Sequence, residues 1–168
     1  MDPGGRGDLP AGTHRAVPWR PPFRASRGHA RHHGRSPVVG RQRALADTSV
    51  FIGMEAGRFD RTRFRDFEWG VCVVTLGELR TGVLMAIAPE IAQRRLATYQ
   101  LAQRFEPIPV DEAVGDAWAL LVSQLLQSRR KAPVNDCWIA ATAIAHDIPL
   151  VTQDGDYDAM PGLEVVRL

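Results

Sequence analysis

The chain contains very little lysine or cysteine and has no long hydrophobic run. Lys131 is the single lysine among 168 residues, so arginine supplies nearly all of the positive charge. Cys72 and Cys137 lie far apart in apolar stretches, and we expect buried thiols in a reducing compartment, the cytoplasm, rather than a disulfide framework. No apolar run reaches the length of about 18 residues that a membrane span needs, so we expect no membrane partner. A Gly-Lys-Ser/Thr phosphate loop is also missing, which excludes that class of nucleotide-binding protein.

Charge is distributed unevenly along the chain. Residues 1–44 carry nine arginines and two aspartates, a formal charge of +7, whereas residues 45–168 carry twelve basic and seventeen acidic residues, a formal charge of −5. Residues 1–43 show no helical or strand period, and they do not contain enough apolar area to offset the entropy of ordering them. We therefore expect a disordered basic extension over residues 1–43 and one folded domain over residues 44–168.

Three interpretations of the extension stay open. The first is a start codon assigned too far upstream, with Val38 or Val39 close to the natural start of the domain. The second is a basic tail that attracts nucleic acid. The third is a targeting peptide, because the segment is rich in arginine and poor in acids, although it has neither an amphipathic helix nor a secretory apolar region.

Short apolar runs alternate with helical patterns in the rest of the chain. The predicted strands are Ala44–Asp47, Val71–Val74, Pro107–Val110, Leu150–Thr152 and Glu164–Arg167. The predicted helices are Arg61–Phe67, Thr75–Met85, Pro89–Phe105, Asp111–Gln127 and Asn135–His146, and Ser49 is expected to cap a further helix. Strands separated by helices predict an α/β fold, in which right-handed crossovers connect a parallel sheet.

Five acids lie where the predicted strands end or where the following helices begin. They are Asp47, Glu78, Asp136, Asp154 and Asp156. In an open parallel sheet, the carboxyl ends of the strands and the N-termini of the crossover helices share one edge, and ligands bind there. Because these acids come from four separated segments, the sequence predicts that they converge on one site.

A cluster of carboxylates favours a bound metal ion. Like charges raise one another's pKa, and a hard divalent cation with oxygen ligands relieves the repulsion. Carboxylates without histidine or cysteine favour Mg²⁺ or Mn²⁺ over Zn²⁺. Such a metal activates water and offsets charge on a transferring phosphate, so the predicted chemistry is phosphodiester hydrolysis.

Each acid also has a local structural explanation. The segment Thr75–Glu78 matches a capping box, and Asp136 suits the positive end of a helix dipole. Asp154 can cap the turn Gly155–Ala159. Asp47 is the hardest to explain locally, because an acid directly after a buried strand is poorly placed for solvation. These explanations do not predict convergence on one edge, so we favour the metal site.

Four segments carry a family resemblance when they are taken together. They are Leu45-Ala-Asp47-Thr48-Ser49, Thr75-Leu-Gly-Glu78-Leu79-Arg80-Thr-Gly82, Asn135-Asp136-Cys-Trp138-Ile-Ala-Ala141 and Pro149-Leu-Val-Thr152-Gln-Asp154-Gly-Asp156-Tyr157. In order and spacing they resemble the VapC toxins of VapBC toxin–antitoxin systems, which are PIN-domain endoribonucleases. The resemblance covers residues 44–168 and has no counterpart for residues 1–43. It implies a PIN-like three-layer α/β/α fold with a central parallel sheet of four to five strands.

The resemblance also implies a set of functional residues and partners. The family's metal-binding acids match Asp47, Glu78, Asp136 and Asp154, with Asp156 as a partner of or replacement for Asp154, and with Thr48, Asn135 and Thr152 in supporting positions. Proteins of this family use Mg²⁺ or Mn²⁺, cut RNA and form homodimers. A VapB antitoxin covers the site, and operator DNA is bound only through the antitoxin complex.

RNA must approach a domain of formal charge −5, so positive side chains are expected beside the acids. The candidates are Arg80, the group Arg129, Arg130 and Lys131, and a rim of Arg58, Arg61, Arg63 and Arg65. In the expected mechanism one or two metal ions lie among the aspartates, and Glu78 binds a metal through water or orients the attacking water. Trp118 and Trp138 are expected to pack in the core or at a dimer interface.

Other protein classes fit less well. A phospho-accepting receiver domain would need a lysine after its last strands, where none occurs. A hydrolase with an aspartate nucleophile would need an acid two residues after Asp47, where Ser49 stands. A catalytically silent PIN domain that only binds an antitoxin stays as the alternative, and the retention of all the acids argues against it.

Overall fold

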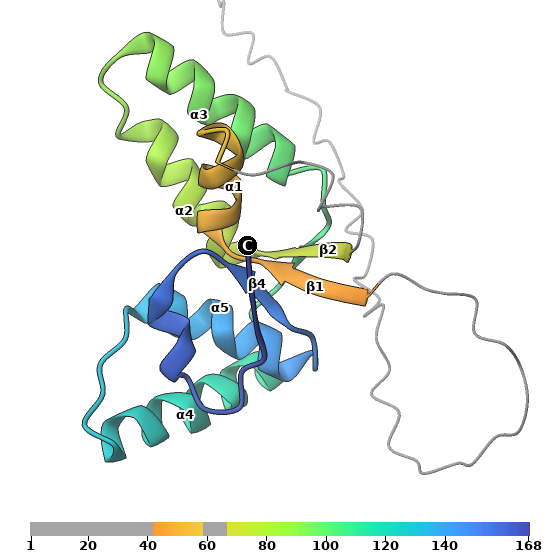
Figure 1. Cartoon of the computed structure of the whole chain (residues 1–168), viewed down its shortest axis with the longest axis vertical. Coiled ribbons are helices and arrows are strands. Elements are labelled where there is room, and N and C mark those ends of the chain that lie inside the picture. The colour runs from red at the N-terminus through yellow and green to blue at the C-terminus, as the bar shows by residue number, and fades with distance from the viewer. Residues whose placement is uncertain (1–41, 59–66) are drawn as a thin grey trace, which may run out of the picture. The chain divides into compact units, whose positions relative to one another are not determined.

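The computed structural model describes residues 42–58 and 67–168, and in these ranges five strands form one sheet. The strands are β1 (Gln42–Ala46), β2 (Phe67–Cys72), β3 (Pro107–Ile108), β4 (Leu150–Thr152) and β5 (Val165–Arg167). Their order across the sheet is β3-β2-β1-β4-β5, and each pair of neighbours is parallel (Figure 1). The predicted parallel sheet of four to five strands is therefore confirmed.

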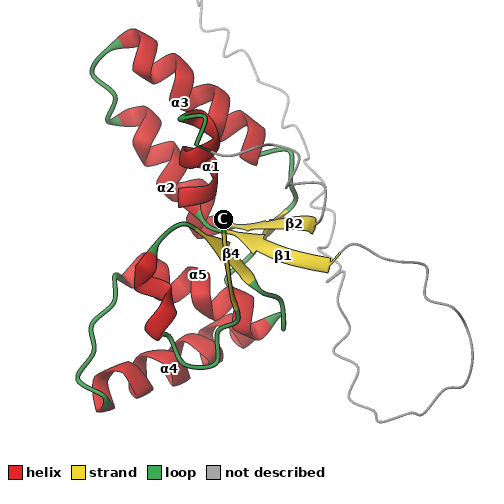
Figure 2. Ribbon diagram, in the orientation of Figure 1, coloured by secondary structure: helices red, strands yellow, loops and turns green. Residues whose placement is uncertain are grey.

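Helices cover both faces of this sheet. They are α1 (Thr48–Glu55), α2 (Val73–Leu84), α3 (Pro89–Ala102), α4 (Glu112–Gln127) and α5 (Val134–Ala145), followed by the short 3-10 helix η2 (Gly155–Ala159). Helices α1, α2 and α3 lie on one side of the strands, and α4 and α5 lie on the other (Figure 2). This is the three-layer α/β/α arrangement that the sequence predicts.

The central strand β1 is buried on both faces, which explains its apolar composition. Ala44 and Ala46 belong to the core on the α1–α3 side, together with Phe51 of α1. Leu45 points to the other side, where it packs in a cluster with Ile139 of α5. All of these side chains are at most 2% exposed. The alternation follows from the two-residue period of a strand, and it fixes the register of β1 between the two helical layers.

Two predicted helix starts are wrong. The strand β2 ends at Cys72, so Val73 begins α2 instead of continuing the strand. Thr75 is then inside the helix, and its hydroxyl lies 3.4 Å from the Cys72 thiol, so the proposed capping box does not form. At α1 the cap is Asp47, whose carboxylate accepts from the Ser49 amide at 3.2 Å; Ser49 itself lies in the first turn.

Some predictions fall outside the described residues. Residues 1–41 of the expected extension and residues 61–66 of the expected helix Arg61–Phe67 lie outside the described ranges. Phe67 itself begins β2. The strand β1 begins at Gln42, two residues before Ala44, where the first strand was predicted to begin. The cysteines are confirmed as buried free thiols. Among the described residues no helix is both long and apolar enough to cross a membrane.

Candidate metal centre

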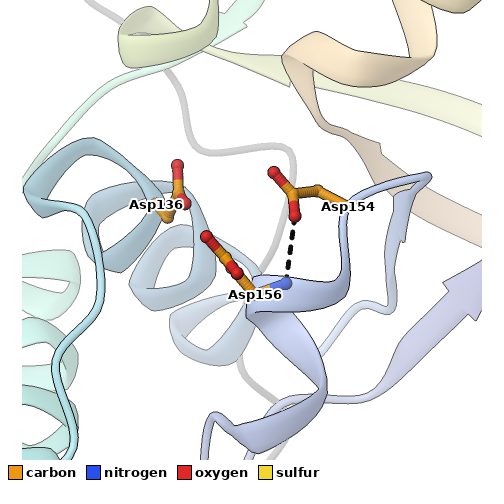
Figure 3. Close-up of side chains that lie close together, drawn as sticks. All are labelled: Asp136, Asp154 and Asp156. Carbon is orange, nitrogen blue, oxygen red and sulfur yellow. Dashed lines mark hydrogen bonds between the residues drawn. The ribbon is translucent and has the colours of Figure 1, made fainter.

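Three aspartates from two neighbouring elements meet at the carboxyl edge of the sheet. Asp136 lies in the first turn of α5, Asp154 follows β4 as the N-cap of η2, and Asp156 lies in η2 (Figure 3). Each offers one carboxylate oxygen, and these oxygens all lie within 4.8 Å of one another. The capping interpretation of Asp154 is also correct, because its carboxylate accepts from the Asp156 amide at 3.0 Å. This cap leaves other lone pairs of the Asp154 carboxylate free, so capping does not prevent the carboxylate from binding a cation.

Asp47 is buried beside this trio and is held by three donors. Asp47 is only 4% exposed. Oδ2 accepts from the Ser49 amide at 3.2 Å and from the Thr152 hydroxyl at 2.8 Å, and Oδ1 accepts from the Tyr157 hydroxyl at 3.0 Å. A carboxylate oxygen has two lone pairs. Oδ2 is therefore fully used, and Oδ1 keeps one lone pair with which to bind a cation.

The Thr152 hydroxyl links the acids of two segments. It donates to Asp47 and accepts from the Asp154 amide at 2.9 Å. The Ser49 hydroxyl lies 3.1 Å from it and accepts from the Gln153 amide at 2.9 Å. Because the proton of Thr152 is given to Asp47, the Ser49 hydroxyl must be the donor to Thr152. This closed network fixes the end of β4 against the start of α1.

Glu78 lies farther along α2 than predicted, because α2 begins at Val73 and Glu78 is in its second turn. Its Oε2 accepts from the Thr48 hydroxyl, and its Oε1 accepts from the Asn135 side-chain amide at 2.8 Å. Thr48 is the first residue of α1, and Asn135 lies in the first turn of α5. Glu78 thus ties three helices together at the edge that carries the aspartates, and each of its oxygens keeps one lone pair.

The electrostatics show that the acids form one group. Burial raises the pKa of Asp136 to about 6 from its ordinary value of 3.8. The next causes are the charges of four other acids, Asp47, Glu78, Asp154 and Asp156. Among the described residues, the ion pairs to arginine involve other acids and none of these five. Concentrated negative charge without a cationic partner fits a divalent cation, because such a cation relieves the mutual repulsion.

Tyr157 is a functional candidate to which the sequence analysis assigned no role, although it ends one of the segments that carry the family resemblance. It is 1% exposed, and its hydroxyl donates to Asp47. Burial, followed by the charges of Asp47 and Asp136, raises the pKa of this phenol well above its ordinary value, so it stays protonated and remains a donor. The available signal was an aromatic residue directly after the acids of a polar turn, and that signal does not reveal its partner.

The predicted basic residues lie at different places. The Arg80 guanidinium lies over the Tyr99 ring, 5.6 Å from its centre, and the ion pairs of the described residues do not join it to Glu78. Arg130 and Lys131 follow α4 and line a pocket that also includes Asp156. The structure therefore brings Arg130 and Lys131 of this group next to Asp156, whereas Arg129 is not part of the pocket lining.

Two further predictions have mixed outcomes. Of the expected arginine rim, Arg58 is described and exposed, while positions 61, 63 and 65 lie outside the described residues. Trp118 and Trp138 stack on each other with ring centres 4.7 Å apart and an interplanar angle of 13°. They join α4 to α5 and are both half-buried, so packing against the fold is seen, while the dimer interface stays a prediction.

Known proteins share this architecture. The PIN domain family matches residues 44–163. Ribonuclease VapC4 of Mycobacterium tuberculosis is 66% identical over 127 residues, which are 76% of this chain and 98% of that protein, and Ribonuclease VapC5 of the same organism is 42% identical over 128 residues, 74% and 94% of the two chains.

Solved structures agree with the sequence matches. The crystal structure of VapBC-5 from M. tuberculosis, a member of the VapBC family of toxin–antitoxin systems, superposes with a TM-score of 0.65 at 37% identity, covering 75% of this chain and 98% of that one. VapBC2 from Rickettsia felis has a TM-score of 0.65 at 21% identity, covering 76% and 99%, and supports the fold alone. The family match over most of the folded domain and the identity to two VapC proteins establish that the chain belongs to the PIN-domain family and, within it, to the VapC ribonucleases.

Proposed function

We propose that the protein is the toxin of a type II toxin–antitoxin pair, an endoribonuclease that hydrolyses RNA phosphodiester bonds at the acid cluster. The observation that carries this proposal is the convergence of Asp136, Asp154 and Asp156 within 4.8 Å, beside a buried Asp47. The 66% identity to a protein named Ribonuclease VapC4 supports the substrate class.

The roles of the acids follow from their free lone pairs. Asp136, Asp154 and Asp156 would hold a divalent cation, and Asp47 would join them through the remaining lone pair of Oδ1. Oxygen-only donors favour Mg²⁺, with Mn²⁺ as a substitute. When bound, the metal supplies Lewis acidity toward the phosphate and an activated water. Asp154 and Asp156 act together here rather than as alternatives.

Glu78 orients the attacking water. Its two oxygens are held by Thr48 and Asn135, so the carboxylate cannot rotate freely, and each oxygen still has one lone pair to accept a proton from water. A carboxylate held in a fixed orientation lowers the entropic cost of placing the water for attack. The prediction that Arg80 and Arg129 contact the RNA substrate stays a prediction.

The proposed partners are a VapB-like antitoxin and a second copy of this chain. VapBC-5, at 37% identity, belongs to a family of toxin–antitoxin systems, which supports an antitoxin here. Leu84, Met85 and Ile87 are 70%, 73% and 99% exposed around the α2–α3 connection, and adjacent apolar side chains of this kind are commonly covered by protein partners. Operator DNA would be bound through the antitoxin complex. Buried free thiols agree with a cytoplasmic location.

The metal dependence of RNA cleavage tests the proposal. The purified chain is incubated with a pool of RNAs alone, with EDTA, and with Mg²⁺ or Mn²⁺ restored. We expect cleavage that EDTA abolishes and metal restores. Asp47→Asn and Glu78→Gln should each lose cleavage, while their circular dichroism spectra stay those of the folded wild-type chain. Full activity of Asp47→Asn would refute cleavage at the acid cluster. No EDTA-sensitive cleavage of any RNA would favour the silent binding module instead.

A further inference from the structure

A pocket lies directly beside the acid cluster, between the α4–α5 connection and η2. Its volume is about 300 Å³. Leu125 and Met160 form an apolar part of the lining, and both are core residues that are only 4% and 5% exposed. Arg130, Lys131 and Asp156 supply the charged part. An apolar wall with a few charged groups suits a small amphipathic ligand, and the volume is at the lower end of the range for small-ligand sites, on the order of 300–1,000 Å³.

The pocket shares a residue with the proposed nuclease centre. Asp156 lines the pocket, and its carboxylate belongs to the trio whose oxygens lie within 4.8 Å of one another. A group bound in the pocket is therefore next to the phosphate that the acids act on. In a polymeric substrate, the group at that position is the nucleotide adjacent to the bond that is cut.

The turn that carries the basic residues has an unusual backbone. Arg129 has a φ of 56°, the left-handed region. Its amide donates to the Leu126 carbonyl at 3.0 Å, and the Arg130 amide donates to the Leu125 carbonyl at 2.8 Å. This pair of bonds is the Schellman motif, in which glycine is the usual left-handed residue because any Cβ is strained there. Strain of this kind is often kept at functional sites.

The two cations at the pocket have different surroundings. Arg130 donates from Nη1 to the Ala159 carbonyl at 3.1 Å, so it connects the turn to η2. Lys131 is exposed and has no ion-pair partner among the described residues. A lysine ammonium is a compact point charge that binds phosphate well. The single lysine of the chain is thus available to a ligand.

We propose that this pocket is a nucleotide subsite: it binds the RNA nucleotide adjacent to the cut bond, with the base against Leu125 and Met160 and the backbone phosphate on Lys131. The inference rests on the proposed ribonuclease function and adds to it a place where base identity is sensed. A phosphate contact positions the strand, whereas contact with the base discriminates between sequences. The two parts of the subsite therefore have separable effects.

The phosphate contact is tested with Lys131→Ala, with Arg104→Ala in the turn after α3 as the matched loss of an exposed cation. Binding of a labelled single-stranded RNA oligonucleotide to the full chain is measured in EDTA, where no cleavage is expected, over a range of salt concentrations. Lys131→Ala should weaken binding on the order of tenfold. The negative slope of log K against log salt should become shallower by about 0.7, as expected for the loss of one phosphate contact. Arg104→Ala should change neither, and Lys131→Arg should restore most of the binding.

The base contact is tested by filling the pocket. Ala159 is an exposed lining residue, and its backbone carbonyl, which Arg130 uses, is kept in Ala159→Phe. The matched control is Ala97→Phe at an exposed position of α3. With metal restored, the 5′ ends of products from an RNA pool are sequenced. Ala159→Phe should raise KM several-fold, leave kcat nearly unchanged and alter base preference next to the cut.

The outcomes separate this inference from the function on which it rests. If the wild-type chain cleaves RNA while Lys131→Ala and Ala159→Phe match their controls in binding, KM and base preference, the subsite is refuted and the ribonuclease stands. If the wild-type chain cleaves no RNA, the proposed function fails. The binding measurement still tests the phosphate contact by itself, because it needs no cleavage: equal RNA affinity of Lys131→Ala and Arg104→Ala overturns that contact.

Discussion

Replacing Tyr157 with phenylalanine should destabilise the metal-free fold by more than its small size suggests. The change removes one hydroxyl and keeps the ring, so no large cavity forms. The hydroxyl donates to Asp47 at 3.0 Å, and the two residues are 1% and 4% exposed. The buried carboxylate of Asp47 then keeps only two of its three donors. A hydrogen bond to a charged group contributes about 1.5–3 kcal/mol, and we expect a loss of stability in that range.

The assay is urea unfolding in EDTA, followed by circular dichroism, for Tyr157→Phe and for a matched control. Tyr99→Phe removes the same atom, but the Tyr99 hydroxyl accepts an exposed bond from Gln103 at 3.0 Å. Its loss should cost less than about 0.5 kcal/mol, as for most surface changes. Equal stabilities of the two variants would refute the idea that Tyr157 holds Asp47 in place.

Four further predictions concern the Asp136 titration, the Mg²⁺ affinity of the site, Arg129 and Cys72. The pKa of Asp136 is raised from 3.8 to about 6, so the protonated form of this residue favours the folded state. That contribution to stability is present below about pH 4 and is lost as the pH rises through about 6. The Tm in EDTA should therefore fall between these pH values, and it should fall less in Asp136→Asn. Mg²⁺ affinity, measured by calorimetry, should weaken below pH 6 as protons compete for the same carboxylate. Arg129→Gly should stabilise the chain by about 0.5–1 kcal/mol in urea unfolding. The change removes the strain of a left-handed Cβ, and this gain exceeds the cost of the greater entropy that glycine gives the unfolded chain. A loss of stability would contradict this. Burial raises the pKa of the Cys72 thiol, so iodoacetamide should label it only after denaturant is added, and rapid labelling of the folded chain would show that it is accessible.

The architecture was predictable because it depends on short-range patterns. Continuous apolar runs such as Leu150–Thr152 mark strands buried on both faces, and that strand has the predicted limits. Convergence of the acids followed from topology, since parallel strands and their crossover helices share one edge. Asp136 and Asp154 lie where that reasoning placed them.

The local details of the site were not predictable in the same way. The capping box at Thr75–Glu78 satisfied every local rule, but α2 starts two residues earlier, and Glu78 bonds instead to Thr48 and Asn135, which are 30 and 57 residues away in sequence. The hydrogen bond that Tyr157 donates to Asp47 joins two residues that are 110 positions apart in the sequence. Partners this distant are chosen by packing in three dimensions, which residue spacing along one segment does not record.

The pocket beside Asp156 was beyond sequence reasoning for a related reason. Arg130 and Lys131 were singled out by charge, but their proximity to the acids depends on how the α4–α5 connection meets η2. That contact is made by one hydrogen bond, from Arg130 to the Ala159 carbonyl, and by the left-handed turn before it. Neither feature has a signature in a single sequence, because arginine is an unusual choice at such a turn.

Metal binding and RNA cleavage, measured together on Asp136→Asn, test the central claim most directly. Asp136 lies in the carboxylate trio and senses the charges of all four other acids. Asp116 on α4 is exposed and is not among those acids, so Asp116→Asn is the matched control. Mn²⁺ is titrated into each folded protein by calorimetry, and cleavage of an RNA pool is followed in parallel. The account predicts that Asp136→Asn loses both Mn²⁺ binding and cleavage while Asp116→Asn keeps both. Wild-type cleavage by Asp136→Asn, or cleavage by the wild-type chain that persists in EDTA, would contradict a metal-dependent nuclease at this cluster.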